Sequence, residues 1–211
     1  MAGPFRLTKD GVEEQFGTNH LGHFLFTREL LPVLLNTPHA RVVNVSSVAH
    51  GNAPSQGIDF ENINQESAMS NWTRYGQSKL ANILFSLALD KRYGDKLFVN
   101  SLHPGMMIKF YAHLNMIGWV KTELIRGVQE SSPFLARVSD FFTSFLALDP
   151  LRGAFTSLYV ATSPDIVSKN IKAKYFIPLA DSEDPIPLAK DQTLADRLWD
   201  FSEKLVAEKL K

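Results

Sequence analysis

Two short apolar runs with a long amphipathic run between them set the strongest constraint on how this chain folds. Arg41 to Val45 and Leu97 to Leu102 have the β-branched and apolar composition of buried strands. Between them, Trp72 to Tyr93 repeats apolar residues at helical spacing, and Gly94 marks the end of that helix. Two strands joined by a helix pair in parallel, because the chain must cross over the sheet to return. The order therefore predicts an α/β protein with a right-handed parallel crossover.

Further elements are predicted on either side of this unit. Thr8 is a candidate N-cap for a helix that runs to about Leu35. Gly17 and Gly22 lie inside this helix, where each costs about 1 kcal/mol relative to alanine. We therefore expect a local reason for them, such as the close packing of another backbone. Residues 49–70 are rich in glycine, asparagine, serine and proline and predict a long loop. Later in the chain we expect a helix over 150–161, a third strand over 174–177 and an amphipathic C-terminal helix that carries Leu194, Leu198, Phe201 and Leu205.

The composition fits one globular domain. With 211 residues, 45% of them hydrophobic, the chain can bury a real core, and we expect a single domain over 1–211. Lys and Arg together number 22, as do Asp and Glu, so no basic footprint for nucleic acid is visible. The lack of cysteine excludes disulfides, thiol nucleophiles and cysteine-ligated zinc.

No apolar run reaches the roughly 20 residues of a membrane span, and no signal peptide is recognisable at the start, so we expect a cytoplasmic protein. The stretch 128–150 is rich in phenylalanine but interrupted by Arg137 and Asp140. It predicts a lid over an apolar substrate pocket, and contact with a membrane surface is the alternative.

A tyrosine and a lysine at positions 75 and 79 are candidates for proton transfer. Residues four apart share a helix face, so the Tyr75 and Lys79 side chains can converge. Free tyrosine titrates near pH 10, so acid–base work at neutral pH needs a shift worth about 4 kcal/mol. A nearby cation supplies that only in a partly dry cleft. The competing interpretation is a surface helix with a solvated lysine.

Polar or turn-forming residues follow both strands of the central unit. Ser46 and Ser47 come after the first strand, and His103, Pro104 and Gly105 follow the second. In parallel α/β sheets the carboxyl ends of strands are where ligands bind. His20 and His23 lack a third ligand at suitable spacing, so no metal site is predicted.

Four ordered blocks resemble the short-chain dehydrogenase/reductase family, in particular its retinol-dehydrogenase-like branch. They are residues 16–24, 44–47, 75–82 and 102–105, and the tail from Lys174 to Trp199 is similar to the end of that branch. The resemblance covers nearly the whole chain. It implies a Rossmann-like, doubly wound parallel sheet with flanking helices.

The resemblance also implies a reaction and its residues. The expected activity is NAD- or NADP-dependent interconversion of an alcohol and a carbonyl on a small apolar substrate. Tyr75 would be the acid/base, Lys79 would lower its pKa and bind the cofactor ribose, and Ser47, rather than Ser46, would hold the substrate oxygen. Asn19 would anchor a water of the proton relay. The nicotinamide would be met by Pro104, Gly105, Val120 and Thr122.

Two departures from the family pattern stand out. The family begins with a strand, a glycine-rich turn that seats the pyrophosphate, and three further strands. No two glycines here are separated by a single residue, so the chain has no such turn. Met1 resembles an internal methionine used as a start, which predicts that about three strands of the sheet remain. The strand over 41–45, central in the family, would then have an uncovered edge.

The second departure is the segment 106–118, which separates Gly105 from Val120 and Thr122 and carries three of the five methionines. One hypothesis is a translated, unspliced intron, and the other is a genuine loop insertion. For the chain as a whole, the alternative to an active enzyme is a truncated remnant or a non-catalytic subunit. Such a subunit would form a homo- or heterodimer through the long helices.

Overall fold

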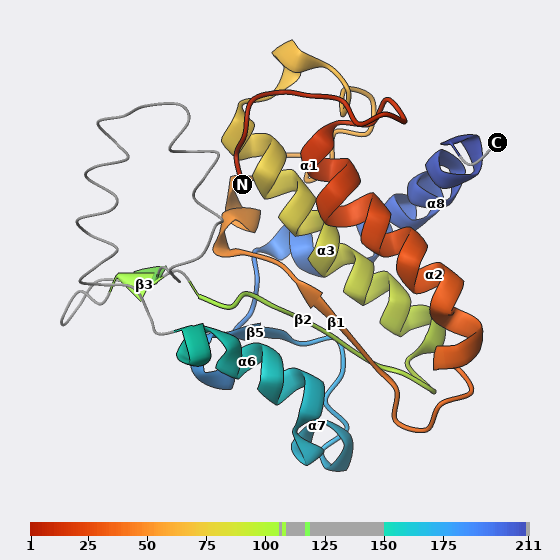
Figure 1. Ribbon diagram of the computed structural model, residues 1–211, viewed down its shortest axis with the longest axis vertical. Coiled ribbons are helices and arrows are strands. Elements are labelled where there is room, and N and C mark those ends of the chain that lie inside the picture. Colours follow the sequence, from red (N-terminus) through yellow and green to blue (C-terminus); the bar gives the residue numbers. More distant parts are fainter. Residues whose placement is uncertain (106, 109–116, 119–149, 210–211) are drawn as a thin grey trace.

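The computed structural model describes residues 1–105, 107–108, 117–118 and 150–209. Within them the chain folds as an α/β protein around a sheet of order β1-β2-β5-β6 (Figure 1). β1 (Arg41–Val45), β2 (Phe98–Leu102) and β5 (Tyr175–Ile177) are parallel, which confirms the predicted α/β class and the parallel pairing. A fourth strand, β6 (Asp181–Ser182), pairs antiparallel with β5. It was not predicted, because two exposed residues are too short to show an alternating pattern.

Helices cover both faces of the sheet. One face carries α1 (Glu14–Phe16), α2 (Gly22–Leu34), α3 (Asn71–Tyr93) and α8 (Gln192–Lys209), whereas α6 (Pro150–Thr162) and α7 (Pro164–Ser168) lie on the other (Figure 1). The larger core lies on the α3 side, and a small cluster packs under α6. Short 3-10 turns, labelled η, fill the connections: η2 (Val48–Asn52), η3 (Glu66–Ala68), η5 (Pro178–Ala180) and η6 (Pro187–Lys190).

The first helix begins later than predicted. Thr8 lies in a turn, where its backbone N–H donates to Val12 O at 2.8 Å, and it does not cap a helix. The cap is Glu13, whose carboxylate accepts the N–H groups of Gln15 and Phe16. A glutamate buried among apolar side chains gives no sequence signal for a cap, whereas threonine does, so the prediction was wrong by about five residues.

A π-helix, η1 (Gly17–Leu21), joins α1 to α2. The N–H of Gly22 donates to the carbonyl of Gly17, five residues earlier. A Cβ on Gly17 would lie 3.1 Å from the Thr8 side chain. This contact supplies a local packing reason for a glycine at position 17.

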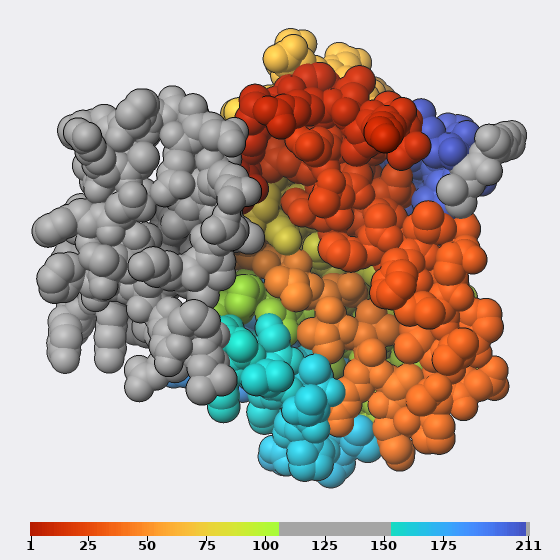
Figure 2. All heavy atoms as spheres, in the orientation of Figure 1, coloured from red at the N-terminus to blue at the C-terminus, as the bar shows by residue number. Residues whose placement is uncertain are grey.

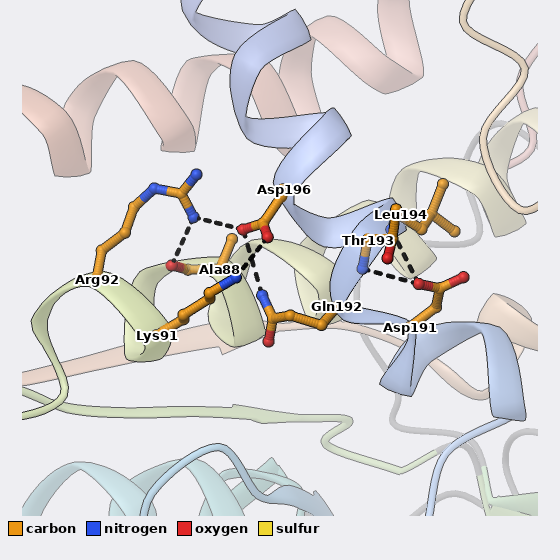
Figure 3. A network of polar contacts seen from close by, with 8 residues as sticks. All are labelled: Ala88, Lys91, Arg92, Asp191, Gln192, Thr193, Leu194 and Asp196. Carbon is orange, nitrogen blue, oxygen red and sulfur yellow. Dashed lines mark hydrogen bonds and ion pairs between the residues drawn. The ribbon is translucent and has the colours of Figure 1, made fainter.

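A polar network fixes α8 against the end of α3 (Figure 3). Lys91 Nζ lies 2.7 Å and Arg92 Nη1 2.9 Å from the two oxygens of Asp196. Asp191 accepts the N–H groups of Thr193 and Leu194 and so starts α8. The network holds the C-terminal helix over the core that supports α3.

Parts of the predicted insertion and the predicted lid lie outside the described residues. Within 106–118 the structure describes β3 (Met107–Ile108) and β4 (Ile117–Gly118), which pair antiparallel. Nearly all of the predicted lid, residues 128–149, lies outside. Among the helices described, none is both long and apolar enough to cross a bilayer.

Candidate active site

The predicted catalytic side chains meet where β1 and β2 end. Ser47 follows β1 and starts η2, and the first half of α3 packs on η2 with Tyr75 and Lys79. Val45 pairs with Leu102 at the ends of the two strands, so Pro104 and Gly105 follow at the same edge. The fold therefore brings together residues that lie up to 58 positions apart.

Tyr75 is nearly enclosed. Its side chain is 5% exposed and meets the Trp72 ring edge-on at 6.3 Å between centroids. Burial raises the pKa of Tyr75 above its ordinary value of 10, and the hydroxyl of Ser47 partly opposes that rise. The phenol is therefore held protonated in this structure.

Lys79 lies next to Tyr75 but bonds elsewhere. Its Nζ is 5.7 Å from the Tyr75 ring centroid and donates to Val45 O at 3.2 Å. Burial lowers the pKa of Lys79 to about 8. The expected lowering of the Tyr75 pKa by Lys79 is not found in this structure: burial raises that pKa, and the influence that opposes burial comes from the Ser47 hydroxyl.

The two serines after β1 have different surroundings. Ser46 is buried, and its hydroxyl donates to the carbonyl of Lys79 at 2.7 Å. Ser47 is half-buried, its Oγ accepts a weak 3.2 Å bond from the N–H of Ala49, and its hydroxyl is near enough to Tyr75 to influence the pKa of the phenol. Of the two hydroxyls, that of Ser47 is the less buried, and its implied role in holding a substrate oxygen stays a prediction.

Asn19 connects the π-helix to α3. Its Nδ2 donates to Ser78 Oγ at 3.0 Å, and Ser78 Oγ donates to the carbonyl of Tyr75 at 2.8 Å. Ser78 was missed from the sequence, although its place between Tyr75 and Lys79 on a buried helix face is a usable signal. The implied role of Asn19 in holding a water stays a prediction.

The backbone conformation at position 105 requires glycine. Its φ is +99°, and a Cβ there would lie 2.8 Å from Pro178 Cγ. Its N–H donates to His103 Nδ1 at 3.2 Å. Val120 and Thr122, the other predicted nicotinamide contacts, lie outside the described residues.

His50 is a supporting residue that sequence reasoning missed. Its Nδ1 lies 2.7 Å from the carbonyl of Ser47, and its Nε2 accepts the N–H of Ile186 at 3.3 Å. Both contacts are satisfied by one neutral tautomer, with the proton on Nδ1. Burial lowers the pKa of His50, which favours that neutral form. The ring thereby ties the turn after Ser47 to the loop before η6.

The two histidines of the first helix do not converge. His20 is buried against Phe16 and lies 2.9 Å from Ser202 Oγ, whereas His23 is exposed and bonds the carbonyl of Asn19. Within the part of the chain that the structure describes, no group of three or more metal-ligating side chains occurs.

Gly76 sets how closely α3 approaches the turn that carries Ser47. A Cβ at this position would lie 2.6 Å from Ala49 O and 2.8 Å from the Asn52 carbonyl carbon. We expect Gly76→Ala to lower the free energy of unfolding by about 1–3 kcal/mol, although alanine is the better helix former by about 1 kcal/mol. Urea unfolding measures the change.

The matched control for this prediction is Gly51→Ala in η2 itself, where the added Cβ meets only Ile186 Cγ2 at 3.9 Å. We expect it to leave stability within about 0.5 kcal/mol. Equal stability of Gly76→Ala and the unchanged protein would show that the turn moves away without cost.

Comparison with known proteins gives the family. No family model matches the chain. A protein of known structure from Mycobacterium paratuberculosis is 33% identical with a TM-score of 0.64, over 98% of this chain and 63% of that one. Short-chain dehydrogenase TIC 32 A, chloroplastic, of Brassica napus is 39% identical over 96% of this chain and 60% of its own length. The chain belongs to the short-chain dehydrogenase/reductase family. This confirms the predicted family.

Other relatives agree with the predicted branch. Mouse retinol dehydrogenase 14 is 39% identical over 96% of this chain and 55% of its own length. The chain thus spans about 60% of the length of the curated relatives it matches, or slightly less. The structure accordingly matches part of the Rossmann-like fold of this family.

Proposed function

We propose that this chain carries the proton-transfer centre of an NAD- or NADP-dependent oxidoreductase that interconverts an alcohol and a carbonyl. The observation that supports this most is the meeting of Ser47, Tyr75 and Lys79 beside the carboxyl end of β1, with a buried phenol and a half-buried hydroxyl. The retinol dehydrogenases among the relatives support an apolar alcohol as the substrate class.

Each residue has a defined task in carbonyl reduction. Ser47 Oγ would donate a hydrogen bond to the carbonyl oxygen and hold it next to the Tyr75 hydroxyl. Tyr75 would give its proton to that oxygen as the carbonyl carbon is reduced, and solvent would restore the proton. Lys79, once it leaves Val45 O, would stabilise the phenolate. In alcohol oxidation the same proton returns to Tyr75.

The residues fit one end of the cofactor. The Lys79 ammonium would be a donor for ribose hydroxyls, and Tyr75, Pro104 and Gly105, which lie at the same edge of the sheet, would hold the nicotinamide, which supplies or accepts the hydride when bound. For the pyrophosphate, residues 1–105 and 150–209 contain no glycine-rich turn at a helix start. The described residues therefore offer contacts for the ribose and nicotinamide of the cofactor and no glycine-rich turn for its pyrophosphate.

Cofactor titration tests the proposal. The purified chain is titrated with NADH and with NADPH by fluorescence, and consumption is followed with retinaldehyde as an apolar probe. Saturable binding of one cofactor and carbonyl-dependent consumption are the expected result. If the chain showed no cofactor binding and no turnover, the proposal would be overturned for this chain. That result would favour a non-catalytic subunit, a role also consistent with the raised pKa of Tyr75.

A further inference from the structure

Two buried histidines that the proposed proton transfer does not use each bond the backbone of one half of the site. His50 Nδ1 lies 2.7 Å from the carbonyl oxygen of Ser47, and the backbone N–H of His50 donates to the same oxygen at 3.0 Å. His103 Nδ1 accepts the N–H of Gly105 at 3.2 Å. One imidazole therefore holds the turn that carries the Ser47 hydroxyl, and the other holds the turn that we assign to the nicotinamide.

The ring of Tyr175 packs against both imidazoles. Its centroid lies 5.1 Å from that of His50, which it meets edge-on, and 5.8 Å from that of His103. Tyr175 is fixed by β5, where it pairs with Ser101 of β2, and the N–H of His103 donates to the carbonyl of Phe176 at 2.9 Å. His50 and His103 are each 7% exposed and Tyr175 is 5% exposed. The three packed rings therefore connect the turn after β1 with the turn after β2.

The turns themselves are more accessible than the rings that connect them. Ser47, Pro104 and Gly105 are half-buried, whereas the three rings are buried. Figure 2 shows atoms of the β2 segment, in green, at the surface next to atoms of the β1 segment, in orange, above α6 in cyan. A substrate or cofactor at this edge meets the turns, so the rings act through the backbone that they hold.

The hydrogen bonds require opposite tautomers of the two imidazoles. His50 donates from Nδ1 and accepts the N–H of Ile186 at Nε2, so its proton is on Nδ1. His103 accepts at Nδ1, so its neutral ring carries the proton on Nε2. A second proton on either ring would face the N–H of Ile186 or of Gly105 and break that bond. Both rings must therefore be neutral to hold the two turns.

Burial keeps both rings neutral. It lowers the pKa of His50, although the carbonyl that this ring bonds and the exposed Glu183 carboxylate oppose the change. It lowers the pKa of His103 to about 4, and the charge of His50 acts in the same direction. The helix α3, which packs on η2, adds Tyr75 and Lys79 to the titratable groups near these rings. Near pH 7 the two imidazoles are therefore in the form that their bonds require.

We propose that His50 and His103 are positioning residues, which hold the Ser47 hydroxyl and the Gly105 turn at a fixed separation across the ring of Tyr175. This role rests on the proposed function, because it matters for catalysis only if a substrate oxygen and a nicotinamide meet at this edge. The two residues hold different groups. Loss of His50 should therefore affect turnover, and loss of His103 should affect cofactor binding.

Proton–nitrogen correlation NMR of the imidazole rings tests the bonding in the unchanged protein. Near neutral pH we expect the proton of His50 on Nδ1 and that of His103 on Nε2. The same tautomer in both rings, or a doubly protonated ring, would overturn the proposed role. The measurement needs no cofactor, no turnover and no variant, so it gives an answer even if the protein lacks the proposed activity or a variant fails to fold.

Leucine and asparagine variants separate positioning from packing. His50→Leu removes the ring donor to Ser47 O, and it should lower kcat at least about tenfold with the cofactor Kd within about twofold. His103→Leu removes the acceptor of the Gly105 N–H and should weaken cofactor binding at least about tenfold. His50→Asn and His103→Asn restore a donor or an acceptor near the place of Nδ1 and should recover most of each loss.

His39→Asn is the matched control. His39 is exposed and precedes the start of β1, at the end away from Ser47, and its φ of +57° is one that asparagine adopts readily. It should change neither kcat nor the cofactor Kd. Folded leucine variants that keep both constants, or asparagine variants that recover nothing, would contradict the positioning role.

Hydrogen exchange at the Gly105 amide distinguishes failure of this role from failure of the proposed function. If the unchanged protein neither binds cofactor nor turns over, the proposed function fails. The amide should still exchange faster with solvent in His103→Leu than in His103→Asn, because only asparagine offers it an acceptor. Equal exchange in the two variants would show that His103 does not hold the Gly105 turn.

Discussion

Replacement of Tyr75 by phenylalanine is expected to lower carbonyl reduction by a factor of roughly 10² to 10⁴, the usual contribution of a positioned acid or base. The change removes the hydroxyl that we propose passes a proton to an oxygen held by Ser47. Because the ring remains, the packing against Trp72 is kept. Turnover at saturating cofactor measures the loss, and the fold is checked by circular dichroism.

Tyr93→Phe is the matched control, since it removes a phenol from the last residue of the same helix, five turns away from Tyr75. It should leave turnover within twofold. If Tyr75→Phe retained more than half of the activity, another group would have to supply the proton and the assignment of Tyr75 would be wrong.

Acid should destabilise this protein through His20. Burial lowers the pKa of His20 to about 3 from the ordinary 6.5, so the unfolded chain binds a proton that the folded chain refuses. The stabilisation is fully present above pH 6.5 and is lost as the pH falls toward 3. At about 1.4 kcal/mol per pH unit, the loss reaches about 3 kcal/mol by pH 4. Urea unfolding between pH 7 and pH 4 measures it.

The variant His20→Gln isolates this contribution. Glutamine does not titrate and retains a group that can bond Ser202 Oγ, so its stability should fall less steeply between pH 7 and pH 4. His103, whose pKa burial lowers to about 4, still acts in the variant and leaves some slope. His23→Gln controls for loss of an exposed imidazole from the same helix. A slope for His20→Gln identical to that of the unchanged protein would contradict the buried, neutral state of His20.

Local sequence pattern was enough for the central elements. The strand predicted over 41–45 is β1 to the residue, and the helix predicted from Trp72 is α3 from Asn71, with Gly94 at its end as expected. These signals are local, because apolar periodicity and a terminating glycine act within one element. The sheet edge at β1 was also predicted, and the strand order confirms it.

Elements defined by distant contacts were missed. The start of α1 depends on the carboxylate of the buried residue Glu13. The backbone N–H of Glu13 in turn donates to Asn64 Oδ1, 51 residues away. The two-residue β6 exists because β5 offers it an edge. Neither has a pattern in its own stretch of sequence.

For the site, the sequence by itself determined which side chains share a helix face and which follow a strand, because these depend on spacing alone. It placed Tyr75 beside Lys79, whereas the choice of Ser47 for the substrate oxygen came from the family resemblance and stays a prediction. Only the tertiary structure decided how the groups ionise. Burial raises the pKa of Tyr75 and lowers that of Lys79, whose ammonium turns to the carbonyl of Val45 at the open edge of β1. A pKa depends on all that surrounds a group in space, and spacing along the chain does not contain that information.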